Sequence, residues 1–368
     1  MNTGRLATCV VILAVIMHGG RVSGADRPKV RATADRLAPE QQVVYVPIEG
    51  DLVTTCGPRC AEVSGLAWCG DDLIILPQYP ELFTTKAMGI GARIFTIPKT
   101  RILTFLDGRS SAPVRPRGIV LVDQGLGRRF KAPEIFEGYE SIAFFGDRAF
   151  LTIETKTNIS TDSSTGQTAT RGYLVAGRLN ADHSELRIDP DTLRATGSPS
   201  HIHNMADESV IVFPGAVMSL YEANGANVNP RPIAHAFDSD LREVKAIPMP
   251  NIEYRITDVT AADEQGRFWA VNFFFAGDAR RLDPAVDELS RRHGIGKTHA
   301  RYKTVERLVE LAYEDGRISL TSTIPIYLQL VDDDQARNWE GVVRLDDRGF
   351  LLMADEYPKT ILAFVPAP

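Results

Sequence analysis

A short apolar pattern recurs five times along this chain, and internal repeats of this kind constrain an architecture more strongly than any local signal. Each copy opens on an acid, runs through an apolar segment to a polar or glycine-containing turn, and returns through a second apolar segment. The clearest copies are Glu140–Glu154 and Glu208–Glu222, which both begin Glu-Ser and end on a glutamate 14 residues later. The other copies begin at Glu62, Asp258 and Glu340.

Two apolar runs around a polar turn predict a β-hairpin. Each copy is followed by a second, more amphipathic pair of runs, so each unit predicts four antiparallel strands. The clearest second pairs are Gly172–Leu179 with Leu186–Ile188, Ile233–Phe237 with Val244–Ile247, and Arg307–Tyr313 with Ile318–Thr323. Radial arrays of such sheets are β-propellers. We therefore expect an all-β propeller with five blades, six being the alternative count, and a β-sandwich as the competing fold.

The two ends of the chain predict how the ring closes. Thr360–Val365 predicts a third strand of the last unit, after which the chain ends. Gln42–Pro47 offers the missing fourth strand, and its pairing there would remove an open sheet edge. Helical periodicity is convincing at one place, Asp283–His293, so a single helical insertion is expected near residues 283–293.

The start of the chain predicts a signal peptide. The apolar run Leu6–Met17 has 12 residues, fewer than the roughly 20 that span a bilayer. Small and polar residues follow, so cleavage is expected after Gly24 or Ala25. We expect residues 1–24 to be the signal peptide and residues 25–368 to be one exported propeller domain without a membrane span. A membrane anchor is the alternative interpretation.

The balance of charges excludes a general nucleic-acid binder. The chain carries 41 Lys and Arg against 47 Asp and Glu, a net charge of −6. Phosphate backbones are bound by basic surfaces, and cleavage of the leader would remove Arg5 and Arg21 and make the chain more acidic still.

Three cysteines follow the leader within 14 residues: Cys56, Cys60 and Cys69. Exported proteins usually meet an oxidising compartment, so one disulfide and one remaining thiol are expected. The sequence does not select the pair.

The repeat also predicts a site. The first strand of each propeller blade lines the central channel, so the acids at matching positions should gather at one mouth. The inner set is Glu62, Glu140, Glu208, Asp258 and Glu340, and the set that ends the second strands is Gln78, Glu154, Glu222, Asn272 and Asp355 or Glu356. Confined carboxylates need a counter-charge, and Ca²⁺ accepts irregular cages of oxygen ligands. The alternative is that these acids are structural and accept hydrogen bonds from backbone amides.

The last copy carries a family resemblance. Its segments Trp339-Glu340-Gly341-Val342-Val343, Asp346-Asp347-Arg348-Gly349 and Asp355-Glu356 resemble the β-propeller phytases and the broader phytase-like domains. This resemblance implies that Glu340, Asp355 and Glu356 help to bind calcium at the channel mouth. Two features depart from the family, since the phytases have six blades and Asp355 replaces the usual glutamate. The five-bladed calcium-activated nucleotidases are a looser likeness.

A basic loop is expected over the same mouth. Residues 273–304 include Arg280, Arg281 and Lys297, which could bind an anionic small-molecule substrate beside a metal ion. The sequence therefore predicts a calcium-dependent hydrolase of phosphate esters or related esters, without identifying its catalytic residues. The alternative is a non-catalytic exported propeller that binds a ligand or protein partner on this face.

Overall fold

A computed structural model describes residues 36–54, 61–84, 91–130, 134–158, 168–200, 202–333, 335–355 and 359–368. These residues belong to one compact unit, Ala32–Pro368. The expected signal peptide, Cys56, Cys60 and Glu356 lie outside the described residues. None of the helices in the described ranges is long and apolar enough to cross a membrane.

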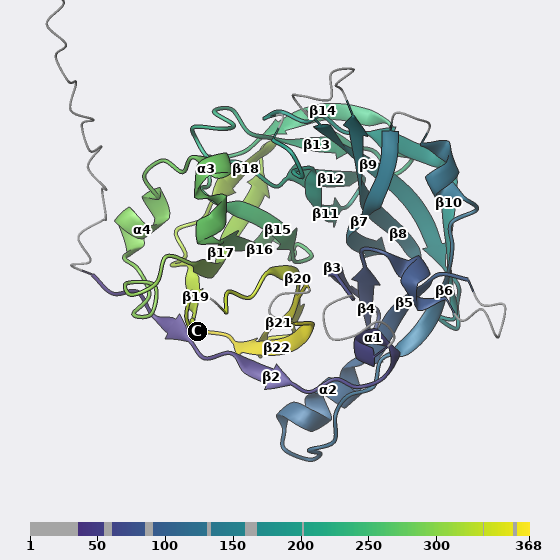
Figure 1. Cartoon of the computed structure of the whole chain (residues 1–368), viewed down its shortest axis with the longest axis horizontal. Helices are drawn as coiled ribbons and strands as arrows, with labels where there is room; N and C mark the ends of the chain where they lie inside the picture. Colours follow the sequence, from purple (N-terminus) through teal and green to yellow (C-terminus); the bar gives the residue numbers. More distant parts are fainter. Residues whose placement is uncertain are drawn as a thin grey trace, which may run out of the picture. The chain divides into compact units, whose positions relative to one another are not determined.

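The strands of the described residues form four hydrogen-bonded sheets (Figure 1). The largest sheet consists of two antiparallel sets of four strands, joined where β6 and β10 pair in parallel. The first set is β3 Val63–Cys69, β4 Asp72–Pro77, β5 Arg93–Pro98 and β6 Arg117–Val122, and the second is β7 Glu134–Phe145, β8 Arg148–Asn158, β9 Thr168–Leu179 and β10 Glu185–Ala195.

The other three sheets repeat the same antiparallel plan. One contains β11 Asp207–Phe213, β12 Ala216–Tyr221, β13 Ile233–Phe237 and β14 Glu243–Pro248. The next contains β15 Arg255–Val259, β16 Arg267–Phe274, β17 Val305–Glu314, β18 Arg317–Leu320, β19 Ile326–Leu328 and β1 Glu40–Gln41. The last contains β20 Trp339–Leu345, β21 Gly349–Ala354, β22 Ile361–Pro366 and β2 Val44–Val46. The repeated hairpins and the second hairpins predicted from the sequence are therefore present.

Five first strands form the inner wall of a closed ring. In the described part of the chain β3 contacts β7, β7 contacts β11, β11 contacts β15, β15 contacts β20, and β20 returns to β3. Figure 1 shows the sheets radiating from this common centre. The arrangement is all-β and propeller-like, as the sequence predicts.

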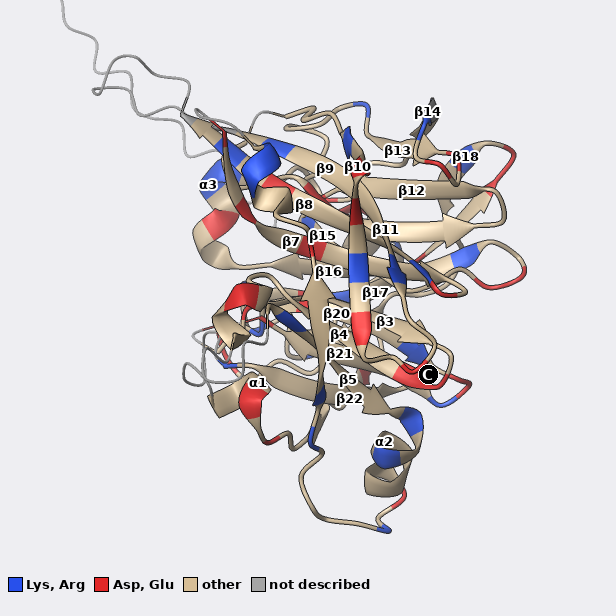
Figure 2. Ribbon diagram, turned by 90° about the vertical axis from the view of Figure 1, so that its right-hand side faces the viewer, with Lys and Arg blue, Asp and Glu red and all other residues tan. Residues whose placement is uncertain are grey.

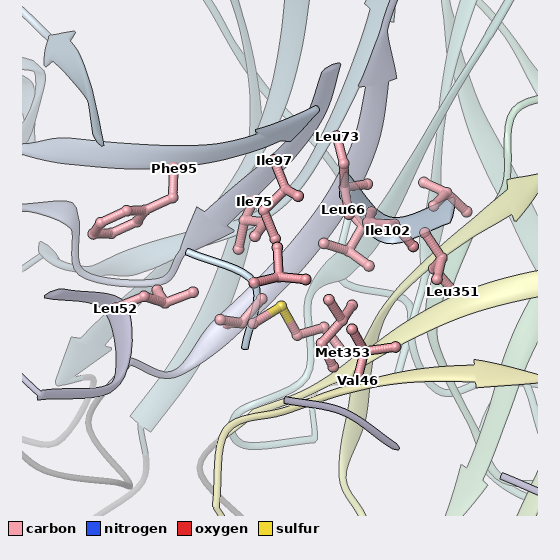
Figure 3. Close-up of a cluster of buried hydrophobic side chains, with 14 of the residues drawn as sticks. Val46, Leu52, Leu66, Leu73, Ile75, Phe95, Ile97, Ile102, Leu351 and Met353 are labelled. Carbon is pink, nitrogen blue, oxygen red and sulfur yellow. The ribbon is translucent and has the colours of Figure 1, made fainter. Parts of the chain in front are cut away.

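The N-terminal strand pairs where it was expected. β2 runs antiparallel to β22, with Val44 opposite Phe364 and Val46 opposite Leu362. Val46 is buried in an apolar cluster that also contains Ile75, Leu351 and Met353 (Figure 3). The predicted closure of the last sheet by the N-terminal segment is confirmed.

The expected helix at 283–293 is only partly present. α3 Ala279–Leu282 ends before Asp283, whose φ is 37°. Asp283 precedes Pro284, and the proline ring disfavours the α-helical conformation of the residue before it. α4 Glu288–His293 begins after its N-cap Asp287, whose side chain accepts a hydrogen bond from the backbone N–H of Leu289 at 3.2 Å. The prediction of a continuous helix over residues 283–293 was therefore wrong. The remaining helices are α1 Asp51–Thr54, α2 Lys99–Leu106 and the 3-10 turns η1 Pro80–Phe83, η3 Leu126–Arg129 and η4 Ala276–Asp278.

Candidate functional site

Each inner strand carries an irregularity in its pairing, and we infer that it decides which side chain faces the end of the channel. In β7 the pairing with β8 shifts between Tyr139 and Ser141, so Glu140 is an extra residue in the ladder. A β-bulge of this kind re-aims the side chain that it carries. The corresponding shifts make Ser64, Glu208 and Glu340 the extra residues of β3, β11 and β20.

Five glutamates from these strand ends are buried, although carboxylates are rarely buried without a partner. They are Glu140, Glu154, Glu208, Glu222 and Glu340. We call these five residues, together with Arg255, the acidic mouth.

Arg255 supplies positive charge inside the acidic mouth. Its Nη2 donates to Glu340 Oε1 at 3.0 Å and lies 3.5 Å from Glu208 Oε2, and its Nε donates to Glu222 Oε1. Burial lowers the pKa of Arg255, but Glu340 and Glu208 raise it by more, so the net pKa lies above the ordinary value. Arg255 was not predicted from the sequence, because only the matching acids were followed along the repeat.

A polar relay holds Arg255 in place. Its Nη1 donates to Asn338 Oδ1 at 3.2 Å, and Asn338 Nδ2 donates to Asp355 Oδ2 at 3.1 Å. The guanidinium also lies over the ring of Phe273, 5.8 Å from its centroid. The predicted site residue Asp355 therefore reaches Arg255 through an amide side chain.

Glu140 and Glu154 make no ion pair with Arg255 among the described contacts. Gln78 Nε2 donates to Glu140 Oε1 at 2.9 Å. Burial, and then repulsion from Glu154 and Glu208, raises the pKa of Glu140 well above its usual range. Burial, and then Glu208, raises the pKa of Glu154 to about 8. This corner therefore favours a bound proton or a bound cation at neutral pH.

Glu222 and Glu340 are also buried carboxylates whose charge is only partly compensated. Burial raises the pKa of Glu340 well above its usual range, although Arg255 lowers it. Glu222 Oε2 is buried and has no hydrogen-bond partner in the described part of the chain. Arg255 alone thus leaves the buried carboxylates incompletely compensated.

Asp258 lies deeper in the channel than the repeat predicted. The ladder shift in β15 spans Thr257 and Asp258, which places Asp258 one position further along its strand than Glu140 in β7. Its Oδ1 accepts from Ser141 Oγ at 3.0 Å, and its Oδ2 accepts from the backbone N–H of Val342 at 2.8 Å. The expectation that Asp258 lies with the other four acids at one mouth is therefore corrected, because a single-residue slip changes the side that a strand residue faces.

The remaining predicted acid of the inner set is Glu62. It is half-buried and lies two positions before the ladder shift at Ser64, so its place in β3 does not match that of Glu140 in β7. It is nevertheless close enough to Tyr79 that, after burial, it contributes to raising the pKa of that phenol.

Of the three predicted basic residues, Arg281 lies nearer to the acidic mouth than the exposed Arg280 and Lys297 do. Arg281 Nε pairs with Asp278 Oδ1 at 2.9 Å, and together with Arg255 it lowers the pKa of Glu208, which burial nevertheless keeps raised. Arg281 therefore lies within electrostatic reach of the acidic mouth. Arg280, also on α3, and Lys297, in the loop after α4, are exposed. In Figure 2, α3 carries this positive charge on the left-hand side of the molecule.

The side chains of the acidic mouth carry the kind of donor atoms that bind calcium. Carboxylates, with the amide oxygens of Gln78 and Asn338 nearby, are ligands of the kind that Ca²⁺ takes. As arranged, the described residues contain no group of three or more His, Cys, Asp or Glu side chains that could hold a metal ion. The side-chain chemistry therefore fits calcium, while Arg255 already engages three of the carboxylates.

Cys69 is a free, buried thiol. Its Sγ lies 3.9 Å from His183 Nε2, and burial raises its pKa. Of the three cysteines considered for a disulfide, it is the one within the described residues.

Comparison with known proteins gives distant structural likenesses. No family model matches the chain and no curated protein matches it in sequence. A glucose dehydrogenase structure aligns with a TM-score of 0.41 and 11% identity, covering 84% of this chain and 97% of that chain. A GH43 endo-arabinanase from Bacillus licheniformis aligns with a TM-score of 0.45 and 10% identity, covering 87% and 96%. The soluble aldose sugar dehydrogenase from Escherichia coli gives 0.38 and 11%, covering 84% and 97%.

Proposed function

We propose that this protein is an exported, phytase-like β-propeller that hydrolyses phosphate esters or related esters at its acidic mouth with the help of bound calcium. The observation that carries the proposal is the imbalance of buried charge, since Arg255 pairs with three of the five buried glutamates of the acidic mouth. Confined carboxylates of this number require protons or a further cation. The leader-like N-terminus supports export.

Calcium would be held where Arg255 compensates least. Glu140 and Glu154 have no ion pair to Arg255 among the described contacts, and Glu208 reaches it only at 3.5 Å. Glu140 and Glu154 are the proposed protein ligands, and water would complete the coordination of the ion. A divalent ion there would polarise a phosphoryl oxygen and lower the pKa of bound water.

The chain's own residues would bind the ester and hold the metal ion. Arg281 stands at the edge of the acidic mouth and is partly exposed, so it could pair with an anionic substrate. Without a metal ion Glu154, with a pKa of about 8, carries a proton at neutral pH, and calcium binding would displace that proton.

The family and the blade count belong to the same proposal. The Glu340-Gly341 hairpin followed by Asp355 supports a phytase-like origin. The continuous ring of β3, β7, β11, β15 and β20 supports five blades, with the eight-stranded sheet counted as two.

The proposal is tested by assaying chelator-treated protein against p-nitrophenyl phosphate and p-nitrophenyl acetate, with and without added calcium. We expect turnover that requires calcium and falls about a hundredfold in Glu154→Gln, because a proposed calcium ligand is lost. Glu314→Gln, at an exposed turn, is the matched control and should behave as wild type. Absence of turnover on both substrates, or equal loss in the control, contradicts the proposal.

A second function is favoured by one observation. The three ion pairs of Arg255 supply counter-charge from within the chain. A non-catalytic propeller that binds a ligand or protein partner on this face would also need such counter-charge. Calcium binding without turnover would favour that function.

A further inference from the structure

The channel contains a cavity at the end opposite the acidic mouth. Its volume is about 240 Å³, and residues of all the inner strands line it. The wall is formed mostly by aliphatic side chains, including Leu66, Ile142, Val210, Val259 and Val343. An apolar cavity of roughly 150 Å³ is large enough to stay dry and bind benzene, so this one can accept a larger apolar group.

The cavity is separated from the acidic mouth by a layer of hydrogen bonds. Asp258 accepts from Ser141 Oγ and from the backbone N–H of Val342, and the backbone N–H of Leu66 also donates to it. Ser141 Oγ accepts in turn from the backbone N–H of Val210 at 3.3 Å. These bonds join the inner strands at the inner end of the cavity, where Leu66 and Val210 belong to its lining, and no residue of the acidic mouth lines it.

Arg344 and Asp263 both line the outer rim of the cavity, and the Arg344 guanidinium lies over Phe350, 6.0 Å from its ring centroid. Arg344 lines the cavity, its side chain is 42% exposed, and its Nη1 lies 4.0 Å from Asp263 Oδ2. Asp263 is already engaged, because its carboxylate accepts from Arg267 Nε at 2.9 Å and from the backbone N–H groups of Gln265 and Arg267. The guanidinium of Arg344 is therefore positioned to meet an anion at the entrance of an apolar cavity.

We propose that this cavity binds a small amphiphile, an apolar chain or ring of about six to ten carbons that bears one carboxylate. The apolar part enters the channel between the inner strands, and the carboxylate pairs with Arg344 at the rim. This site is independent of the function proposed for the acidic mouth.

The test is calorimetric titration of the full protein with sodium hexanoate, with sodium acetate and 1-hexanol as probes that each lack one part of the ligand. Hexanoate is expected to bind saturably at one site, 1-hexanol more weakly, and acetate not at all. Equal heats for hexanoate and acetate would overturn the proposal.

Variants locate the site. Ala143, in β7, and Ala262, which follows β15, both line the cavity. Ala143→Leu and Ala262→Leu should each fill part of it and raise the Kd for hexanoate about tenfold or more. Arg344→Gln should weaken hexanoate about fivefold and leave 1-hexanol unchanged. Arg348→Gln is the matched control, since its side chain is 44% exposed and pairs elsewhere with Asp107. Wild-type affinity in both filling variants overturns the cavity assignment, and equal behaviour of Arg344→Gln and Arg348→Gln overturns the role of Arg344.

Discussion

Arg255 is the residue on which the electrostatics of the acidic mouth depend. It is buried, it pairs with three glutamates from two different sheets, and Asn338 accepts a hydrogen bond from it. Its removal would leave Glu208, Glu222 and Glu340 buried without that charge. Breaking a buried pair by removing one partner is far more costly than losing a surface pair.

We therefore expect Arg255→Met to lower the free energy of unfolding by about 3–5 kcal/mol at neutral pH. The loss should shrink at acidic pH, because protonation removes the repulsion between the glutamates. Urea unfolding at both pH values measures this. Arg178→Met is the control, since its ion pair with Asp147 is exposed, and a loss as large in the control would contradict the expectation.

Glu154 gives a prediction about pH. Its pKa is about 8 in the folded protein and about 4.3 when unfolded, so the folded state binds more protons between these values. Stability from this group is complete below the lower pKa and is lost as pH rises through the upper one. In chelator, unfolding free energy should fall from pH 5 to pH 8 in wild type and fall less in Glu154→Gln. Parallel profiles would show that Glu154 does not titrate in this range.

Which residues could be predicted depended on how far the repeat holds. Glu140, Glu208 and Glu340 were found because each sits at the same ladder shift. Glu62 and Asp258 were misplaced because their strands shift at other positions. Arg255 carries no repeat signal, since a residue that neutralises a cluster needs to occur only once.

At the scale of elements, hydrogen bonds to Asp258 join the inner strands, and Gly341 lets two of them pack closely. A Cβ on Gly341 would lie 2.7 Å from Leu66 Cγ, so this glycine allows β20 to approach β3. Asp258 then links β15 to β3, β7 and β20 through hydrogen bonds. The layer is a packing device that separates the two ends of the channel.

Asp258→Ala should therefore destabilise the fold. It leaves buried backbone N–H groups of Val342 and Leu66 without this acceptor, and each unsatisfied buried donor costs about 1–3 kcal/mol. The expected loss in urea unfolding is about 2–5 kcal/mol. Asp263→Ala, in the turn of the same hairpin, is the control, and equal losses for the two would argue against a special role for Asp258.

The pairing of β2 with β22 gives a second prediction at this scale. Val46 is 2% exposed, whereas Val44, on the same strand, is 38% exposed. Val46→Asp places a charge in the apolar cluster of Figure 3 and should lower the melting temperature by several degrees or more, consistent with about 3 kcal/mol. Val44→Asp should change it little. Similar melting temperatures for both variants would mean that this strand does not close the sheet.

At the scale of the whole molecule, the ring was predictable and its contents were not. Hairpin spacing and the two chain ends indicated radial sheets and their closure, because strand period and turn chemistry are local signals. The split at Asp283 and Pro284 was locally visible but was outweighed by helical periodicity. The internal counter-charge and the apolar cavity depend on contacts between distant strands, which no local pattern specifies.

The most direct test of the account is calorimetric titration of calcium into chelator-treated protein. We expect calcium to bind saturably at the acidic mouth. Binding should be strongly weakened in Glu140→Gln and in Glu154→Gln, and unchanged in Glu314→Gln. At a hundredfold excess over the Kd, calcium should then raise the free energy of unfolding by about 2.7 kcal/mol, beyond the effect of sodium chloride at matched ionic strength. No saturable heat, or equal binding in wild type and both mouth variants, would contradict the claim that this mouth is a calcium site.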